Sequence, residues 1–116
     1  MATIWQQAEE LKDEMVERRR DLHRHPETGW TEFRTASMII GELKNLGYDV
    51  KFGDDVIDEK SMMGVPSEAE LADYMQRAIS EGADPELVKK MAGGKTGIVA
   101  TLKTDKPGKT VAFRFD

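Results

Sequence analysis

A helix that runs directly into a strand constrains the fold of this chain more than any other feature. Between about residues 31 and 46 the apolar side chains recur at helical spacing, and their face is wide enough to pack on a sheet. The members of this face are Phe33, Ala36, Ile39, Ile40, Leu43 and Leu46. Gly47 follows where a helix takes a left-handed cap, and residues 48–52 alternate apolar with polar side chains, as a half-buried strand does. The sequence therefore predicts an α/β chain, more narrowly an α+β one, in which helices cover a sheet.

A first helix is predicted over residues 4–24, and Pro26 ends it. Its apolar stripe consists of Ile4, Ala8, Leu11, Met15 and Leu22. Arg18–Arg20 and Arg24 stand near the end of this helix, where basic side chains suit the helix dipole. We interpret this basic run as a solvated face, because binding to nucleic acid would need a broader basic patch.

The negative charge is concentrated between residues 53 and 92. This segment holds ten acidic and four basic residues, a net charge of −6, whereas the whole chain carries −5. Ser67 and Glu70 form a capping-box pattern before one short helix, and Asp84-Pro85 opens another. Four of the seven methionines also lie here, at Met62, Met63, Met75 and Met91. Ordinary packing is the simpler interpretation of these methionines, and an adaptable binding surface is the alternative.

The last part of the sequence indicates a β-hairpin. Residues 98–102 and 111–115 both alternate in polarity, and Lys106-Pro107-Gly108 provides a turn between them. With the strand at 48–52 this makes about three strands. Phe113 and Phe115 give the last strand a large aromatic face. Because nothing later in the sequence covers that face, we expect the chain alone to self-associate or to be marginally stable.

Few side chains in this sequence could carry out catalysis. The absence of cysteine excludes disulfides and thiolate ligands. His23 and His25 would point about 200° apart on a helix, so we expect one to cap the helix end or to bind a carboxylate, with a metal or catalytic role as the alternative. Gly93–Thr96 lacks the upstream glycine of a phosphate-binding loop and is interpreted as a turn. Asp116, at the end of a predicted strand, is the remaining catalytic candidate.

Hydropathy gives no sign of a membrane protein. No apolar run approaches the roughly 20 residues of a membrane span, and the N-terminus has no apolar signal core. A soluble, cytoplasmic chain without a membrane partner is therefore expected.

Several short motifs follow one another in an order that is typical of one enzyme family. They are Arg19–His23, Pro26-Glu27, Glu32, Thr35, Leu46–Tyr48, Lys95–Ala100, Pro107–Ala112 and Arg114–Asp116. This order resembles the opening of the zinc-dependent amidohydrolases, which hydrolyse indoleacetyl-amino acids, hippurate and other N-acyl amino acids. The acidic insertion at 53–92 is similar to that of the aminobenzoyl-glutamate hydrolases within this family.

The resemblance implies that this chain corresponds to only one part of a longer enzyme. Residues 1–116 would be the N-terminal part of one zinc-hydrolase catalytic domain, with 53–92 as an acidic helical insertion. The metal ligands and the general base of the family lie after the last residue here, so no metal site is expected in this chain. Asp116 matches an Asp near the metal site without thereby being a ligand, and His23 matches a position with a structural role.

The expected activity of the intact protein is hydrolysis of an N-acyl amino acid such as aminobenzoyl-glutamate. The resemblance implies zinc or another divalent metal as cofactor, a homo- or hetero-oligomer as the assembly, and no nucleic-acid partner. The chain alone is expected to be inactive. The alternative is a free-standing small binding or assembly module that acts through its acidic insertion.

Overall fold

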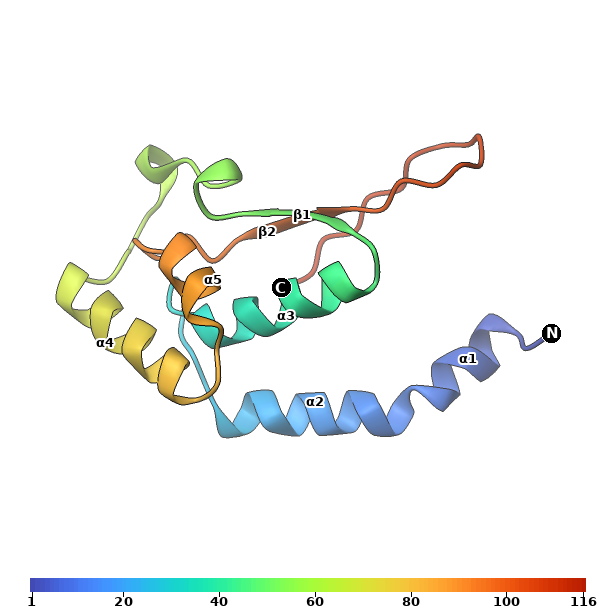
Figure 1. Cartoon of the computed structure of the whole chain (residues 1–116), viewed down its shortest axis with the longest axis horizontal. Coiled ribbons are helices and arrows are strands. Elements are labelled where there is room, and N and C mark those ends of the chain that lie inside the picture. The colour runs from blue at the N-terminus through green and yellow to red at the C-terminus, as the bar shows by residue number, and fades with distance from the viewer.

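A computed structural model describes all of residues 1–116 and shows five α-helices around a two-stranded sheet (Figure 1). The elements are α1 (Ile4–Glu10), α2 (Lys12–Arg24), α3 (Phe33–Asn45), β1 (Asp49–Phe52), α4 (Glu68–Ser80), α5 (Pro85–Lys90) and β2 (Ile98–Thr101). Two short 3-10 turns lie between β1 and α4, at Gly53–Asp55 and Glu59–Ser61. This arrangement confirms the α+β class, the helix-to-strand order at residues 31–52 and the two helices of the acidic segment.

The sheet packs on one side of α3. β1 and β2 are antiparallel, with Val50 opposite Ala100 and Phe52 opposite Ile98. Val50, Phe52 and Ile98 are half-buried against the core, and Val99 on the other face is exposed. The alternation of polarity in β1 thus places its apolar residues on α3, as the period of a strand requires.

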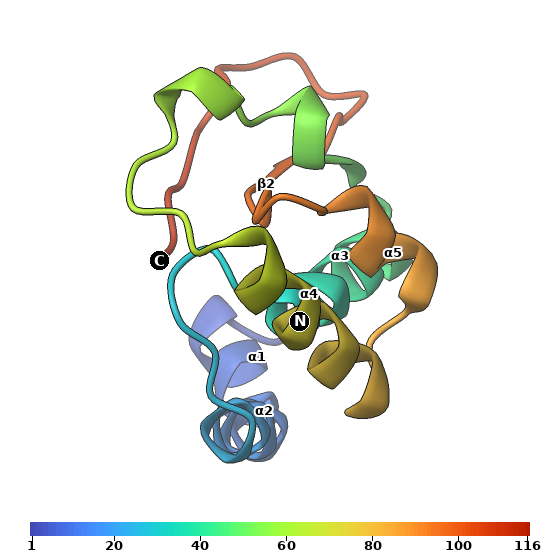
Figure 2. The same cartoon turned by 90° about the vertical axis from the view of Figure 1, so that its left-hand side faces the viewer.

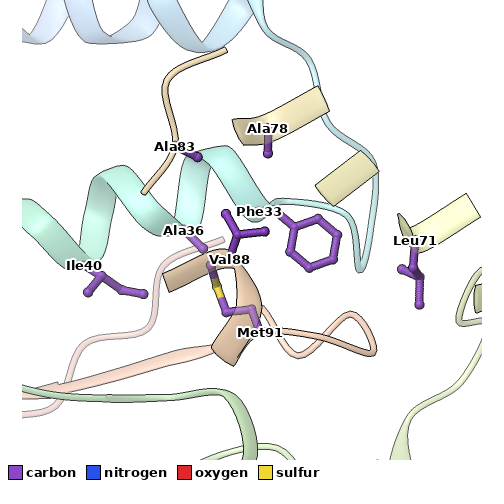
Figure 3. Close-up of a cluster of buried hydrophobic side chains, with 8 residues drawn as sticks. All are labelled: Phe33, Ala36, Ile40, Leu71, Ala78, Ala83, Val88 and Met91. Atoms are coloured by element: carbon purple, nitrogen blue, oxygen red, sulfur yellow. The ribbon is translucent and has the colours of Figure 1, made fainter. Parts of the chain in front are cut away.

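The buried core lies where α3 meets α4 and α5 (Figure 3). Its eight residues are Phe33, Ala36, Ile40, Leu71, Ala78, Ala83, Val88 and Met91. Five of them lie within the acidic segment 53–92, so this insertion supplies much of the interior. Its charges occupy the outer face of α4 and α5, whereas its apolar stripe completes the core that α3 begins.

Local capping explains where the helices of the insertion begin. Ser67 and Glu70 form the predicted capping box at α4, and the Asp84 side chain accepts from the Glu86 N–H at the start of α5. Hydrogen bonds that the Ser67 hydroxyl and backbone N–H donate to the Glu70 carboxylate also lower its pKa. Among all helices of the structure, none combines the length and the apolar character that crossing a bilayer would require.

The single helix predicted over residues 4–24 is wrong in one respect, because the helix breaks at Leu11. The Leu11 N–H bonds to the Ala8 carbonyl, three residues back, and α2 starts afresh at Lys12. Neither α1 nor α2 buries a residue. Most of the stability of a helix in a protein comes from tertiary packing, which α1 and α2 lack. The hydrogen bond at Leu11 therefore takes the shorter three-residue spacing of a 3-10 turn.

The predicted hairpin between 98–102 and 111–115 is also wrong. β2 pairs with β1 instead, and residues 102–116 contain no strand. Pairing with β1 lets Ile98 pack against the core, whereas Val111, Phe113 and Phe115 stay exposed. A hairpin without a packed face is marginally stable, and Phe113 and Phe115 remain exposed and stacked on each other at 6.1 Å.

Candidate functional site

The carboxylate of Glu27 caps the N-terminus of α3 from outside the helix. It accepts hydrogen bonds from the backbone N–H groups of Arg34 and Thr35, both at 2.8 Å, and from the Thr35 hydroxyl at 2.7 Å. Glu32, the N-cap residue, makes no side-chain capping bond. Glu27 therefore supplies the acceptor and the negative charge that a helix N-terminus favours.

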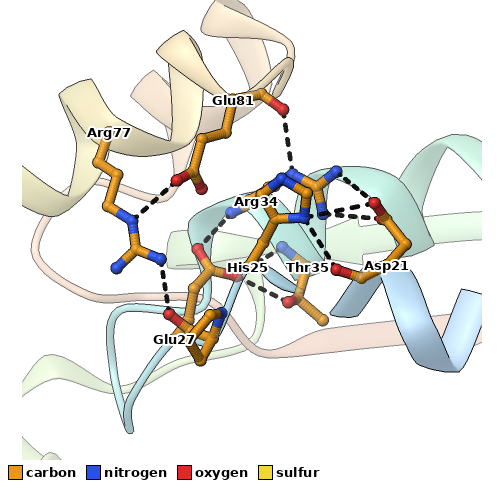
Figure 4. A network of polar contacts seen from close by, with 8 residues as sticks. Asp21, His25, Glu27, Arg34, Thr35, Arg77 and Glu81 are labelled. Atoms are coloured by element: carbon orange, nitrogen blue, oxygen red, sulfur yellow. Dashed lines mark hydrogen bonds and ion pairs between the residues drawn. The ribbon is translucent and has the colours of Figure 1, made fainter. Parts of the chain in front are cut away.

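Arg34 connects three helices (Figure 4). Its guanidinium donates two hydrogen bonds to the Asp21 carboxylate on α2, at 2.9 and 3.1 Å, and a third at 3.0 Å to the carbonyl oxygen of Glu81 after α4. Parallel bonds between a guanidinium and a carboxylate are strong and fix direction. The Arg34 hydrogen bonds lower the pKa of Asp21, against the opposing effect of desolvation.

Arg77 fastens the insertion to the loop before α3. It donates to the Glu81 carboxylate at 3.1 Å and to the carbonyl oxygen of Pro26 at 2.9 Å. Together with Arg34, it holds the C-terminal end of α4 against α2 and the 26–32 loop. We call Asp21, Glu27, Arg34, Arg77 and Glu81 the arginine clamp. The bonds of Arg34 to Asp21 and Glu81 and of Arg77 to Pro26 join separate elements of the scaffold, whereas the Arg77–Glu81 pair lies within the end of α4.

The two histidines have separate surroundings. His25 Nδ1 lies 2.8 Å from the Asp21 carbonyl oxygen, at the end of α2, and 3.3 Å from the Asp21 carboxylate. His23 is exposed, and its Nδ1 lies 3.2 Å from an Arg19 nitrogen. The contacts of His25 are those expected of a histidine that caps a helix end beside a carboxylate. A metal or catalytic role for either histidine stays a prediction.

The Gly93–Thr96 segment forms the predicted turn. Gly94 has φ of +83°, and a Cβ atom on it would lie 3.0 Å from the Trp30 carbonyl oxygen, so only glycine fits without strain. Lys95 pairs with Asp54, which raises the pKa of the lysine. The Thr96 hydroxyl donates to Glu32 at 2.8 Å. The polar groups of this turn are therefore occupied in holding β2 to the rest of the fold.

Asp116 lies on the exposed C-terminal segment, where its carboxylate pairs with Arg114 at 3.0 Å. Because residues 111–116 do not form a strand, Asp116 is not placed at the end of a sheet, and the premise that made it a candidate does not hold in this structure. Its catalytic role in a longer protein stays a prediction.

The basic run and the methionines have ordinary contacts. Arg18 bonds to Glu14 and Glu42, which raises its pKa, and Arg20 lies 3.8 Å from Glu17. Of the four methionines in the insertion, Met91 is fully buried, Met62 and Met75 are half-buried and Met63 is 84% exposed. Packing thus accounts for Met91 and Met75, whereas the Met63 side chain is exposed and only its carbonyl oxygen has a partner, the Trp30 indole N–H at 2.8 Å.

A shallow groove of about 370 Å³ runs between α3 and the turn that joins α4 to α5. Ser37 lines it and accepts the Asp84 N–H at 3.1 Å, and Arg34 and Glu42 lie at its edges. Both of these charged side chains already have partners. The groove therefore presents no free pair of groups for acid–base chemistry.

The chain assembles no ligand set for a metal, since no three His, Asp or Glu side chains converge.

Of the clamp residues, only Asp21 and Glu27 fall within the motifs noted in the sequence, and the others were missed. The signal that could have found Arg34 is a charged residue beside Phe33 at the start of an apolar helix. Its partners, 13 and 47 residues away, could not be deduced from spacing.

Comparison with known proteins agrees with the motifs. No family model matches the chain. It is 50% identical over 107 residues to indole-3-acetyl-aspartic acid hydrolase of Enterobacter agglomerans, covering 92% of this chain and 24% of that protein. It is 42% identical over all 116 residues to one subunit of the p-aminobenzoyl-glutamate hydrolase of Escherichia coli, covering 27% of that protein. The chain thus spans about a quarter of the length of these relatives.

The α+β scaffold and these identities make the chain similar to about one quarter of two hydrolases. More particularly, it matches a solved structure of the aminobenzoyl-glutamate utilization protein of Klebsiella pneumoniae, with a TM-score of 0.87 and 43% identity. That match covers 92% of this chain and 27% of the Klebsiella chain. At this similarity the helices, the insertion and the β1–β2 pair correspond to a fragment of that fold.

Proposed function

We propose that this chain is the N-terminal portion of an amidohydrolase that cleaves the amide bond of an N-acyl amino acid, with aminobenzoyl-glutamate as the specific candidate. One observation carries the proposal: identity of 42–50% to two named hydrolases extends across nearly the whole chain and includes its acidic insertion. The alternative, a free-standing module that acts through the insertion, has no such support. The insertion shares one core with α3, as a part of a larger scaffold would.

Within such an enzyme, this chain would serve as scaffold. The arginine clamp fixes α2, α3 and α4 to one another, and the cap at Glu27 fixes the start of α3. Among the motif residues, Glu27 and Thr35 form this cap, and Glu32 accepts a hydrogen bond from the Thr96 hydroxyl near β2. Their role is to hold α3 and β2 in place, while other residues carry out the chemistry.

A zinc or other divalent ion would supply the activated water of the reaction. The residues of this chain do not fit such an ion, because two separated histidines and dispersed carboxylates give no converging ligands. The ligands would therefore belong to polypeptide outside residues 1–116. A cytoplasmic location and an oligomeric enzyme with a small-molecule substrate complete the proposal.

A chimera tests whether the chain can play this part. Residues of this chain replace the matching quarter of the Enterobacter indole-3-acetyl-aspartic acid hydrolase, and release of aspartate is measured. We expect kcat/KM within about tenfold of that of the parent, because the exchanged part makes scaffold contacts only. The same chimera assayed with aminobenzoyl-glutamate measures whether the chain influences substrate choice.

Two adjacent substitutions serve as controls. Val88→Asp places a charge in the fully buried core and should abolish activity together with cooperative unfolding, whereas Lys89→Asp on the exposed side should have little effect. A chimera that folds cooperatively and yet hydrolyses neither substrate would contradict the proposal.

A further inference from the structure

The segment between β1 and α4 is attached to the rest of the fold by few contacts. We call residues 54–66 the strap. None of its residues is buried, and its backbone hydrogen bonds are local, such as those from the Ile57 and Ser61 N–H groups to carbonyl oxygens four and three residues back. Figures 1 and 2 show this segment on the side of the molecule opposite α2. Its position therefore depends on contacts with side chains and backbone of other elements.

Lys95 holds the first half of the strap. This lysine lies in the turn before β2, and its ammonium pairs with the carboxylate of Asp54 and, at 3.6 Å, with that of Glu59. The Lys95 side chain is only 13% exposed, whereas those of Asp54 and Glu59 are 82% and 79% exposed. The largely covered ammonium thus finds its counter-charges on the strap, and both carboxylates remain open to water and salt.

Trp30 holds the second half of the strap. Its indole N–H donates to the Met63 carbonyl oxygen at 2.8 Å. Trp30 has φ of +67°, which residues other than glycine rarely adopt, and its carbonyl oxygen lies against Gly94. A backbone in such a conformation persists where its surroundings fix it. The indole is therefore attached to a well-defined point of the scaffold, onto which the strap closes.

Ile57 provides the apolar contact between the strap and the sheet. A Cβ atom on Gly97, directly before β2, would lie 2.7 Å from Ile57 Cδ1, so the isoleucine occupies space that a side chain there would fill. Ile57 is half-buried, and none of the eight core residues belongs to the strap. The strap can therefore leave the sheet without removing a side chain from the core.

We propose that the strap is a cover that opens as one unit while the core stays folded, and that the ammonium of Lys95 is its latch. Closed, the strap shields Lys95; open, it releases the ammonium to solvent. Salt favours the open form, because it screens the attraction between the ammonium and two exposed carboxylates. Such an opening costs less than global unfolding, since it gives up few buried contacts. The strap opens in this way whatever the activity of the intact protein.

Hydrogen exchange of the full chain, resolved by residue, tests the proposal. In the wild type we expect Ile57 and Ser61 to share one opening equilibrium constant, at least about tenfold larger than that of Ile40 in the core. This opening should also depend less on urea, because it exposes less surface than unfolding does. Strap amides that exchange only as fast as Ile40, with the same dependence on urea, would overturn the proposal.

Two variants release one anchor each. Lys95→Met removes the ammonium and keeps an apolar stem, and Trp30→Phe removes the indole N–H and keeps an aromatic ring. Each should speed exchange at both Ile57 and Ser61 by about fivefold or more, because one opening serves the whole strap. If Trp30→Phe left Ile57 unchanged, or Lys95→Met left Ser61 unchanged, the strap would not open as one unit and the proposal would fail.

Salt tests the latch in the wild type itself. Raising the salt from about 0.05 to about 0.5 M should speed exchange at Ile57 in the wild type and have little effect in the Lys95→Met variant. Lys89→Met and Trp5→Phe, on exposed side chains without an ion pair, are matched controls that should behave as the wild type does. An equal response of the wild type and the Lys95→Met variant to salt would show that Lys95 is not the latch.

Discussion

Arg34 on α3 donates two parallel hydrogen bonds to the carboxylate of Asp21 on α2, at 2.9 and 3.1 Å. Because α2 buries no residue, this pair, together with the Arg18–Glu42 contact, is a principal attachment of α2 to the rest of the fold. The same guanidinium reaches the carbonyl oxygen of Glu81, so the attachment of α2 is coupled to the position of the insertion. Asp21 is thus the most informative single carboxylate for testing the scaffold.

Acid should weaken the attachment of α2 through Asp21. The hydrogen bonds from Arg34, aided by the charges of His25 and Arg24, lower the pKa of Asp21 below its ordinary value of 3.8. A carboxyl with a lowered folded-state pKa stabilises the fold fully above the unfolded pKa, and this stabilisation is lost as the pH falls through the folded value. Asp21→Asn should therefore lower the free energy of unfolding at pH 7 and reduce its difference between pH 7 and pH 3.

Asp73→Asn is the control, since Asp73 is an exposed carboxylate inside α4, away from its first turn and without an ion pair. Its free energy of unfolding should follow that of the wild type across this range. Equal pH profiles for the Asp21 variant and the wild type would show that the clamp contributes nothing.

The insertion should be essential to the core. Met91 is fully buried and Met63 is 84% exposed, and both lie within residues 53–92. Met91→Ala should cost about 2–5 kcal/mol of unfolding free energy because it leaves a cavity. Met63→Ala should change it by less than about 0.5 kcal/mol. Urea denaturation of the two variants measures the difference, and equal effects would mean that the insertion packs loosely.

The turn before β2 should tolerate no side chain at Gly94. Gly94→Ala puts a Cβ 3.0 Å from the Trp30 carbonyl oxygen in a left-handed conformation, and we expect a loss of about 2 kcal/mol. Gly29→Ala is the control, because its φ is not positive and nothing lies within 4 Å of the added atom. Thermal unfolding should separate the two variants, and similar melting temperatures would show that the turn can rearrange.

The chain alone should neither hydrolyse acyl-amino acids nor bind zinc stoichiometrically. The physical reason is the lack of three converging ligands among its residues. Titration calorimetry with zinc and an assay with aminobenzoyl-glutamate check both statements. Micromolar binding of one equivalent, or turnover by the purified chain, would refute the prediction.

Local patterns in the sequence predicted most helices and caps, but not which strands would pair. The stripe that starts at Phe33 and the capping box at Ser67 are set by neighbours within a few residues, so spacing reveals them. Residues 98–101 pair with 49–52 on one edge, and whether 111–115 add on the other edge depends on what packs on their aromatic face, which is a property of the folded chain. Alternation of polarity identifies the buried face of a strand, but it does not identify the strand that pairs with it.

The contacts of the candidate site were predictable only where the two partners lie a few residues apart in the sequence. His25 caps the end of its own helix, and that contact follows from its position. The bonds from Arg34 to Glu81 and from Arg77 to Pro26 span 47 and 51 residues, and no periodicity links such positions. Motif residues such as Glu27 were noticed through family resemblance, whereas their capping role required the structure.

The central claim is that this chain is one part of an amidohydrolase, and the nucleotide sequence after the Asp116 codon of the natural gene tests it most directly. The account predicts that the reading frame continues and encodes side chains that can hold a divalent metal ion. An in-frame stop codon directly after Asp116 would contradict it, and would favour the small binding or assembly module instead.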